Sequence, residues 1–424
     1  MTNKLKRFEI SEGINLNVIK DDRFKTGRIS IAMYTPLEKN NVSKNAILPF
    51  LLTKSCKMYP DFTSLNKRLD ELYGASIYAD VQNLGDMQEI IMSASFLDDR
   101  YALNNECISE KITELLCDML FNPVTINDNF SIENVNQEKR QLKELIESEY
   151  NDKRIFALNR CKELMCKDEK YGINKLGKKE DIQNMLSKDI HEAWMNLLET
   201  ARFEIFVLGN FDETKALKVF KSAFLDIKRK NIVSFETQII KKAEKENSYN
   251  ETVKATQSKL VMGFRTNIAG QDEDVNAMRV AIALFGATPN SKLFLNVREK
   301  YSLCYYCSAK YDRAKGIMFV QSGVEKENIE KAKKEILNQL EEVKKGNFSD
   351  DDISAIKKSL SNSYKTVNDY LSSLETFYSA QVFDEKIVTP EETIEKINAV
   401  TKDQIVEVAN KITLDTIYTL VGEA

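Results

Sequence analysis

A repeat within the chain constrains its fold more than any other sequence feature. Three short motifs occur twice in the 424-residue sequence, in the same order and at offsets of 214 to 218 residues. They are Asn129–Ser131 with Asn347–Ser349, Tyr150–Asp152 with Val367–Asp369, and Ser187–Asp189 with Thr401–Asp403. One such match is weak evidence, but three in order indicate an internal duplication. We therefore expect two similar domains.

Each half is predicted to be an α+β domain of about 210 residues, a mostly antiparallel sheet with helices packed on one face. A segment that is almost wholly polar at Lys241–Gln257 predicts a linker, which we place at residues 236–257. The N-terminal domain then covers residues 1–235 and the C-terminal domain 258–424. The clearest predicted elements are strands at Gly27–Pro36 and Asp86–Leu97, helical patterns over Asn41–Met58 and Ile132–Cys166, and a hairpin over Leu303–Val324.

Composition narrows the class of protein. Charged residues make up 30% of the chain and the net charge is −4, which gives no electrostatic reason to expect a nucleic acid or an anionic membrane as partner. The N-terminus lacks the apolar stretch of a signal peptide, and no window approaches the roughly 18 apolar residues of a membrane-spanning helix. Seven scattered cysteines fit reduced thiols. These observations predict a cytoplasmic protein.

A single histidine, His191, removes several mechanisms. Zinc-hydrolase helices need two histidines four residues apart and a glutamate base, which this chain cannot supply. His191 itself is expected to be a partly exposed helix residue, since no nucleophile elbow accompanies it. Cys304 and Cys307 form one CxxC pair without a second, and two ligands do not close a metal site. We expect no bound metal or cofactor.

Two polar segments stay open on residue chemistry alone. The charge-dense helix over Glu133–Arg154 suits a solvated face, although a pair of its acids could act in general acid–base chemistry. The segment Asn296–Arg313 combines arginine and tyrosine, which suit a site that grips peptide carbonyls but are also ordinary on a surface.

The first half also resembles the M16 peptidases, of the insulinase and pitrilysin type, and specifically their short two-domain members such as the mitochondrial processing peptidase subunits. In that family a helix carries "HFLEH", followed by a second helix and "GA" before a strand. Here "PFLLT" stands there, followed by Gly74-Ala75. The resemblance places Pro49 and Thr53 at the two zinc histidines and Leu52 at the base. The family's third ligand lies in a helix similar to "EKRQLKELI", and it falls on Leu145.

The second half carries the most specific match. The family pattern "S-x-L-F-x-x-V-R-E-K-x-G-L-x-Y" is similar to "SKLFLNVREKYSLCY" at Ser291–Tyr305. The family arginine and tyrosine that contact substrate near the zinc fall on Arg298 and Tyr305. The usual glycine of the turn is Ser302 here.

The resemblance implies a non-catalytic subunit of a heterodimeric zinc endopeptidase, similar to members encoded beside a zinc-bearing one in Gram-positive bacteria. Its implied partners are a peptide or unfolded polypeptide substrate and a zinc-bearing subunit with an intact HxxEH motif, or a second copy of itself in isolation. Arg298 and Tyr305 would contribute substrate-binding surface to a peptide chamber. One alternative is a structural, assembly or peptide-binding protein of this fold without a proteolytic role. Another is an independent enzyme that uses Cys304 or a carboxylate pair.

Overall fold

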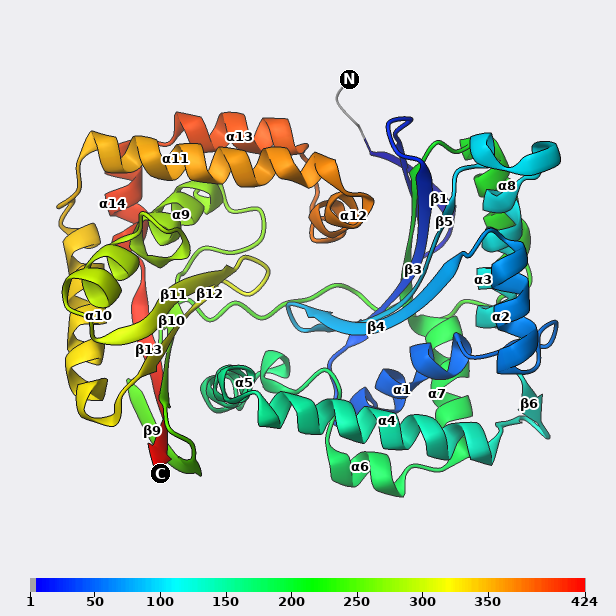
Figure 1. The fold of residues 1–424 in the computed structure, drawn as a ribbon, viewed down its shortest axis with the longest axis horizontal. Helices are drawn as coiled ribbons and strands as arrows, with labels where there is room; N and C mark the ends of the chain where they lie inside the picture. The colour runs from blue at the N-terminus through cyan, green and yellow to red at the C-terminus, as the bar shows by residue number, and fades with distance from the viewer. Residues whose placement is uncertain (1–4, 424) are drawn as a thin grey trace. The chain divides into compact units, whose positions relative to one another are not determined.

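The computed structural model describes residues 5–423, which form two compact units. Of these residues, unit 1 contains 5–147, 173–236 and 370–383, and unit 2 contains 148–172, 237–369 and 384–423. Each unit has its own sheet and its own hydrophobic core (Figure 1). The predicted α+β class, with two domains built on mostly antiparallel sheets, is confirmed.

Unit 1 is built on a six-stranded sheet in the order β1-β2-β8-β3-β5-β4. All neighbours are antiparallel except β2 and β8, which are parallel. The strands are β1 (Lys6–Ser11), β2 (Ile14–Lys20), β3 (Thr26–Pro36), β4 (Ser76–Leu84), β5 (Met87–Leu97) and β8 (Arg202–Gly209). A separate two-stranded ribbon joins β6 (Thr125–Ile126) to β7 (Asn129–Phe130).

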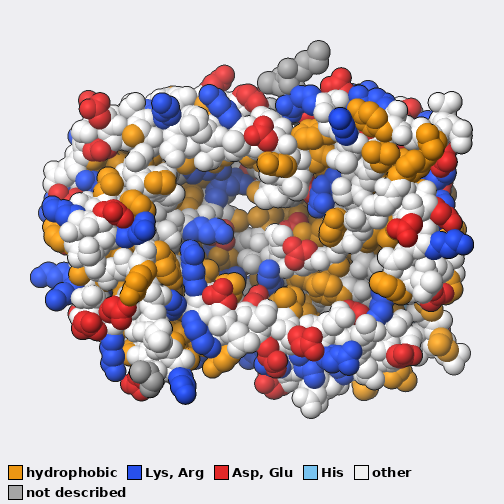
Figure 2. All heavy atoms as spheres, viewed as in Figure 1, with side chains coloured by type: hydrophobic (Ala, Val, Ile, Leu, Met, Phe, Trp, Pro, Cys, Tyr) orange, Lys and Arg blue, Asp and Glu red, His pale blue; other side chains and the backbone are white. Residues whose placement is uncertain are grey.

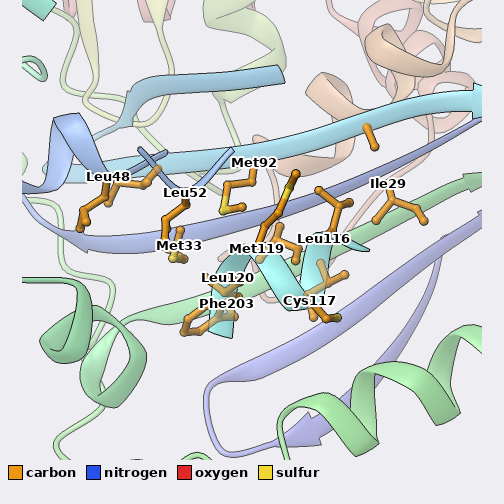
Figure 3. Close-up of a cluster of buried hydrophobic side chains, with 14 of the residues drawn as sticks. Ile29, Met33, Leu48, Leu52, Met92, Leu116, Cys117, Met119, Leu120 and Phe203 are labelled. Atoms are coloured by element: carbon orange, nitrogen blue, oxygen red, sulfur yellow. The ribbon is translucent and has the colours of Figure 1, made fainter. Parts of the chain in front are cut away.

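Helices cover one face of this sheet because alternate strand residues are apolar. Ile29, Ile31 and Met33 of β3 point into this core and are at most 1% exposed. Figure 3 shows Met33 among side chains from the helices and from β5 and β8. These helices are α1 (Val42–Leu52), α2 (Phe62–Glu71), α3 (Ile108–Phe121), α4 (Ile132–Asn151), α6 (Lys179–Asn184), α7 (Ser187–Thr200) and α8 (Glu213–Ala223), while α12 (Leu371–Ser379) lies on the other face (Figure 1).

Unit 2 repeats this plan with five strands in the order β11-β12-β10-β13-β9. The strands are β9 (Asn247–Lys254), β10 (Ser258–Arg265), β11 (Cys304–Asp312), β12 (Ile317–Val324) and β13 (Thr413–Glu423). Its helices are α5 (Lys153–Met165), α9 (Val275–Ile282), η4 (Ala283–Ala287), η5 (Leu293–Lys300), α10 (Ile329–Lys344), α11 (Asp350–Lys365), α13 (Pro390–Ala399) and α14 (Lys402–Asn410). The predicted hairpin is confirmed as β11 and β12.

The two sheets support the internal duplication. Read from β4, the first sheet runs β4-β5-β3-β8-β2-β1 and the second runs β11-β12-β10-β13-β9, and in both the fourth and fifth strands form the parallel pair. The repeated tripeptides also occupy matching places. One pair precedes α4 and α11, the second precedes α5 and α12, and the third begins or caps α7 and α14.

One helix from each half of the sequence belongs to the unit built mainly from the other half. The helical pattern over Ile132–Cys166 is not one helix, because the chain breaks at Asp152, whose side chain caps α5 by accepting from the amides of Arg154 and Ile155. After this break α5 packs on β10 and β13, on the sheet face opposite the other helices (Figure 1). Gly263 of β10 permits this approach, since a Cβ there would lie 2.4 Å from the Met165 sulfur.

Helix α12 has the corresponding place in unit 1, against β3 and β8. Glu375 of α12 forms an ion pair with Arg28 of β3, and Phe383, which follows the helix, meets Tyr34 edge to face at 4.9 Å between ring centroids. The expected domain division at residues 235 and 258 therefore does not describe the compact units, since residues 148–172 and 370–383 cross it.

The expected linker also contains structure. Residues 247–254 form β9, which pairs in parallel with β13 from Thr416↔Asn247 to Glu423↔Lys254. The segment appears polar because β9 is an edge strand with no fully buried residue. Glu251 accepts hydrogen bonds from Arg160 of α5 and Tyr418 of β13, so its polar side chain has structural partners.

The surface of the protein carries side chains of both charges. Basic, acidic and apolar side chains all appear on the face drawn in Figure 2. Within residues 5–423, no helix combines the length and the apolar character needed to cross a membrane.

Candidate functional site

The end of α1 holds three of the positions that the resemblance assigns to zinc chemistry. Pro49 is buried inside the helix, where its ring nitrogen has no proton to give to the carbonyl one turn earlier. Thr53 follows α1 as its C-cap, and its hydroxyl donates to the Pro49 carbonyl over 2.7 Å. At the two positions of the zinc histidines, Pro49 is therefore part of the helix and Thr53 caps its end, and neither side chain offers an imidazole to a metal.

Leu52, at the position of the base, is part of the hydrophobic core. Its side chain is fully buried, and Figure 3 shows it in the same cluster as Leu48, Met33 and Met92. A carboxylate at this place would lose its hydration to an apolar environment. The packing therefore favours leucine here for stability.

Helix α4 carries the fourth position, Leu145, which is 41% exposed. Two turns earlier on the same helix, the buried Glu138 accepts a hydrogen bond from Lys54 Nζ over 2.9 Å. Lys54 directly follows the helix-capping Thr53. A salt bridge thus joins α4 to the end of α1, the two helices that zinc would connect in the resemblance. Sequence reasoning missed this pair because Glu138 lies in a helix dense with charge.

The residues at these four positions do not fit a zinc ion. Zinc in proteins binds thiolate, imidazole and carboxylate groups. The four side chains are a proline, two leucines and a threonine, and residues 5–423 contain no cluster of three His, Cys, Asp or Glu side chains able to hold a metal. Zinc-dependent hydrolysis at this place is therefore unavailable to the chain.

The single histidine lies elsewhere, on α7. His191 is half-buried between the rings of Phe130, at 6.1 Å, and Trp194, at 5.3 Å between centroids. Ile190, Trp194 and Leu197 point into the core as predicted. The histidine therefore packs against aromatic side chains, in agreement with the expected helix residue.

Arg298 lies on η5, a helix with the wider π winding, just before β11. Its guanidinium carbon lies 4.7 Å from the centroid of the Phe294 ring, a cation–π arrangement that directs the side chain. Within the described chain its ion-pair partner is the neighbouring Glu299, at 3.6 Å, and 40% of the side chain is exposed. The side chain is therefore only partly exposed to solvent. Phe294 was not identified from the sequence as a functional residue, although it stands four positions before Arg298.

Tyr305 lies on β11 and is 61% exposed. Its hydroxyl donates to Glu325 Oε1 over 2.5 Å, and this hydrogen bond raises the pKa of Tyr305 above its usual value. Ser302, at the place of the family glycine, has a φ of 51°, so the turn keeps a left-handed residue with serine there. Arg298 and Tyr305 have different partners, Glu299 and Glu325, and they lie on either side of the η5–β11 turn.

Comparison with known proteins decides the family. A profile described as the Peptidase M16 inactive domain matches residues 186–360. A protein of Bacillus subtilis strain 168 called "Probable inactive metalloprotease YmfF" is 32% identical over 411 residues, covering 97% of this chain and 96% of that protein. The chain belongs to the M16 peptidase family.

Solved structures agree with the M16 fold. A conserved protein from Enterococcus faecalis V583 is 29% identical with a TM-score of 0.91, and the alignment covers 99% of both chains. A peptidase M16 inactive domain from Pseudomonas fluorescens has a TM-score of 0.81 at 14% identity, covering 99% of this chain and 98% of that one. A protease from Helicobacter pylori has a TM-score of 0.78 at 16% identity over 99% and 100% of the chains. The M16 fold thus persists where sequence identity is low.

Proposed function

We propose that this M16 chain is the non-catalytic subunit of a heterodimeric zinc endopeptidase and contributes substrate-binding surface through Arg298 and Tyr305. The observation that carries the proposal is a contrast between the two sequence motifs. The metal motif is replaced by core and helix-capping residues, whereas the arginine and tyrosine of the second motif are kept and exposed. The B. subtilis relative, named a probable inactive metalloprotease, supports the non-catalytic part of this proposal.

Arg298 is suited to contact a peptide that is held in a partner's active site. A guanidinium offers up to five N–H donors in a fixed plane, and Phe294 restrains its direction. When a carbonyl becomes tetrahedral its oxygen gains negative charge, and a donor placed beside it lowers the barrier. Tyr305, with its hydroxyl donated to Glu325, offers an exposed ring to an apolar substrate side chain.

The partner is expected to be an M16 chain of similar length with an intact HxxEH motif. Co-purification of the tagged protein from its native cells, followed by identification of the bound chain, tests this. A partner with that motif supports the proposal. A stable complex that contains only other proteins and no peptidase activity supports instead a structural or peptide-binding role.

The role of Arg298 is tested in the reconstituted complex. Arg298→Ala is expected to lower kcat/KM for a peptide by on the order of 10²-fold, the usual effect of removing one oxyanion donor, while the subunits still associate. Lys300→Ala is a matched control, since it removes a positive charge from the same helix. Equal activity of the two variants and the unmodified complex would remove the assigned role. Stoichiometric zinc in the isolated chain would contradict its non-catalytic assignment.

A further inference from the structure

The strand β11 contains an irregularity at the CxxC pair. Cys304 pairs with Val324 and Tyr306 with Gly323, so Tyr305 is an extra residue opposite a continuous β12. In a regular strand, residues three apart point to opposite faces of the sheet. The bulge adds one residue and restores the same face, so that Cys304 and Cys307 stand as next neighbours on one side.

The surroundings of the two sulfurs agree with this placement. Cys307 is 5% exposed and lies in the core of unit 2, and the half-buried Cys304 packs against the same core. Cys304 lies opposite Val324 and Cys307 opposite Ser322, two residues apart on β12, so the two thiols share one face of the sheet. Tyr306 occupies the opposite face, where the Arg154 guanidinium lies 4.6 Å from its ring centroid.

The two thiols differ in acidity. The neighbouring Cys307 thiol, Ser322 and the nearby charge of Arg298 lower the pKa of Cys304 to about 7 against the opposing effect of burial. The pKa of Cys307 is raised, chiefly by the neighbouring Cys304 and by burial. Burial raises the pKa of Cys56 and Cys117 to about 12. Cys304 therefore combines partial exposure with a large thiolate fraction near neutral pH.

We propose that Cys304 and Cys307 form a redox-active dithiol site that reacts with low-molecular-weight disulfides such as oxidised glutathione. The Cys304 thiolate attacks one sulfur of the disulfide RSSR, forming a mixed disulfide and releasing RS⁻. Cys307 then loses its proton to solvent and attacks the Cys304 sulfur, which forms the Cys304–Cys307 bond and releases the second RS⁻. Two protein thiols are oxidised, and one RSSR is reduced to two thiols.

The strand geometry is compatible with a disulfide between the two cysteines. Successive same-face residues of a strand lie about 6.6 Å apart, within the range of roughly 4.4–6.8 Å that a disulfide spans between Cα atoms. The bond would enclose Tyr305 at the bulge, so oxidation would also restrain the segment that presents this tyrosine. The reactivity itself does not depend on the proposed role of Tyr305.

The full-length protein is treated with oxidised glutathione near neutral pH, quenched by alkylation and mapped by mass spectrometry. We expect the unmodified chain to lose two hydrogen atoms through a Cys304–Cys307 link and to retain no glutathione. Cys307→Ser should trap glutathione on Cys304, and Cys304→Ser should leave Cys307 unmodified.

Cys107→Ser serves as the matched control, because Cys107 is also half-buried and lies 3.6 Å from the Lys215 ammonium. It should form the Cys304–Cys307 link like the unmodified chain. Thermal unfolding verifies that each variant is folded, and the pH profile of alkylation at Cys304 should have its midpoint near neutral pH. Retention of glutathione on Cys304 in the unmodified chain, or alkylation of Cys304 no faster than Cys107, would overturn the proposal.

Discussion

A buried charge network holds α5 to the sheet of unit 2, and it gives the strongest test of how this unit is stabilised. Arg265 of β10 donates to Glu169 over 2.6 Å and to Asp415 over 2.8 Å, and Lys315 reaches Glu169 over 2.9 Å. All four side chains are at most 8% exposed, and their two positive and two negative charges balance. Removal of any one of these four charged groups would therefore leave an uncompensated charge inside the unit.

Arg265→Met keeps an apolar stem of similar length but leaves one excess negative charge inside the unit. Breaking a buried ion pair in this way typically costs about 3–5 kcal/mol. We expect the free energy of unfolding, measured by urea titration, to fall by about that amount near pH 7. Arg265→Met combined with Asp415→Asn restores neutrality and should recover more than half of the loss. A loss below about 1 kcal/mol for the single variant would refute the reasoning.

The pH dependence gives a second reading of the same network. Burial raises the pKa of Glu169, but the hydrogen bonds from Arg265 and Lys315 outweigh it and hold the pKa below its usual value. This stabilisation is complete above the unfolded pKa of about 4.3 and is lost as the pH falls through the lower folded value. The penalty of Arg265→Met should therefore shrink on acidification, and a constant penalty would contradict the role of Glu169.

Two further predictions concern unit 1. Burial, with smaller contributions from Glu375 and Asp80, raises the pKa of Glu89 to about 7 although Tyr34 donates to it. Since the folded pKa lies above the unfolded one, the unmodified chain loses free energy of unfolding as the pH rises from about 4 to about 7. Glu89→Gln should therefore have a free energy of unfolding, measured by urea titration, that is higher by up to ~3 kcal/mol at pH 8 and the same at pH 4. Equal stability of Glu89→Gln and the unmodified chain at pH 8 would contradict the raised pKa of Glu89. Leu52→Glu should lower the free energy of unfolding by at least ~3 kcal/mol because it buries a carboxylate, whereas Leu52→Met should cost less than ~1.5 kcal/mol. Recovery of the glutamate variant by zinc, after histidines are added at positions 49 and 53, would show that the core can accept a metal site.

The sequence predicted elements whose stabilising contacts are local or carry an apolar pattern. The β11–β12 hairpin and the inward residues of α7 follow from such patterns. β9 was missed because its polar residues gain their partners from Arg160, some ninety positions earlier, and from β13 at the end of the chain. The end of α4 was missed because the charge pattern continues through the capping Asp152. The packing of α5 depends on Gly263, and the sequence of the helix itself does not predict that contact.

The candidate site likewise has features that the sequence predicted and features that only the structure shows. The single histidine excluded the zinc helix without any structure, since a residue that is absent cannot be a ligand. The orientation of Arg298 by Phe294 and the salt bridge of Lys54 with Glu138 needed coordinates. The proximity of Cys304 and Cys307 was hidden for a different reason. Three positions in a regular strand separate two side chains, and only the bulge at Tyr305 reverses that rule.

The crossing of α5 and α12 between the units has a consequence for the order of synthesis. A ribosome makes residues 1–236 first, yet the segment 370–383 that completes unit 1 follows residues 237–369, the larger part of unit 2. Conversely, residues 148–172 of unit 2 exist long before their sheet does. Domains usually fold in turn as they emerge. Here neither half can finish alone, so each sheet lacks the helix that packs on it until that helix or the sheet's last strand has been made.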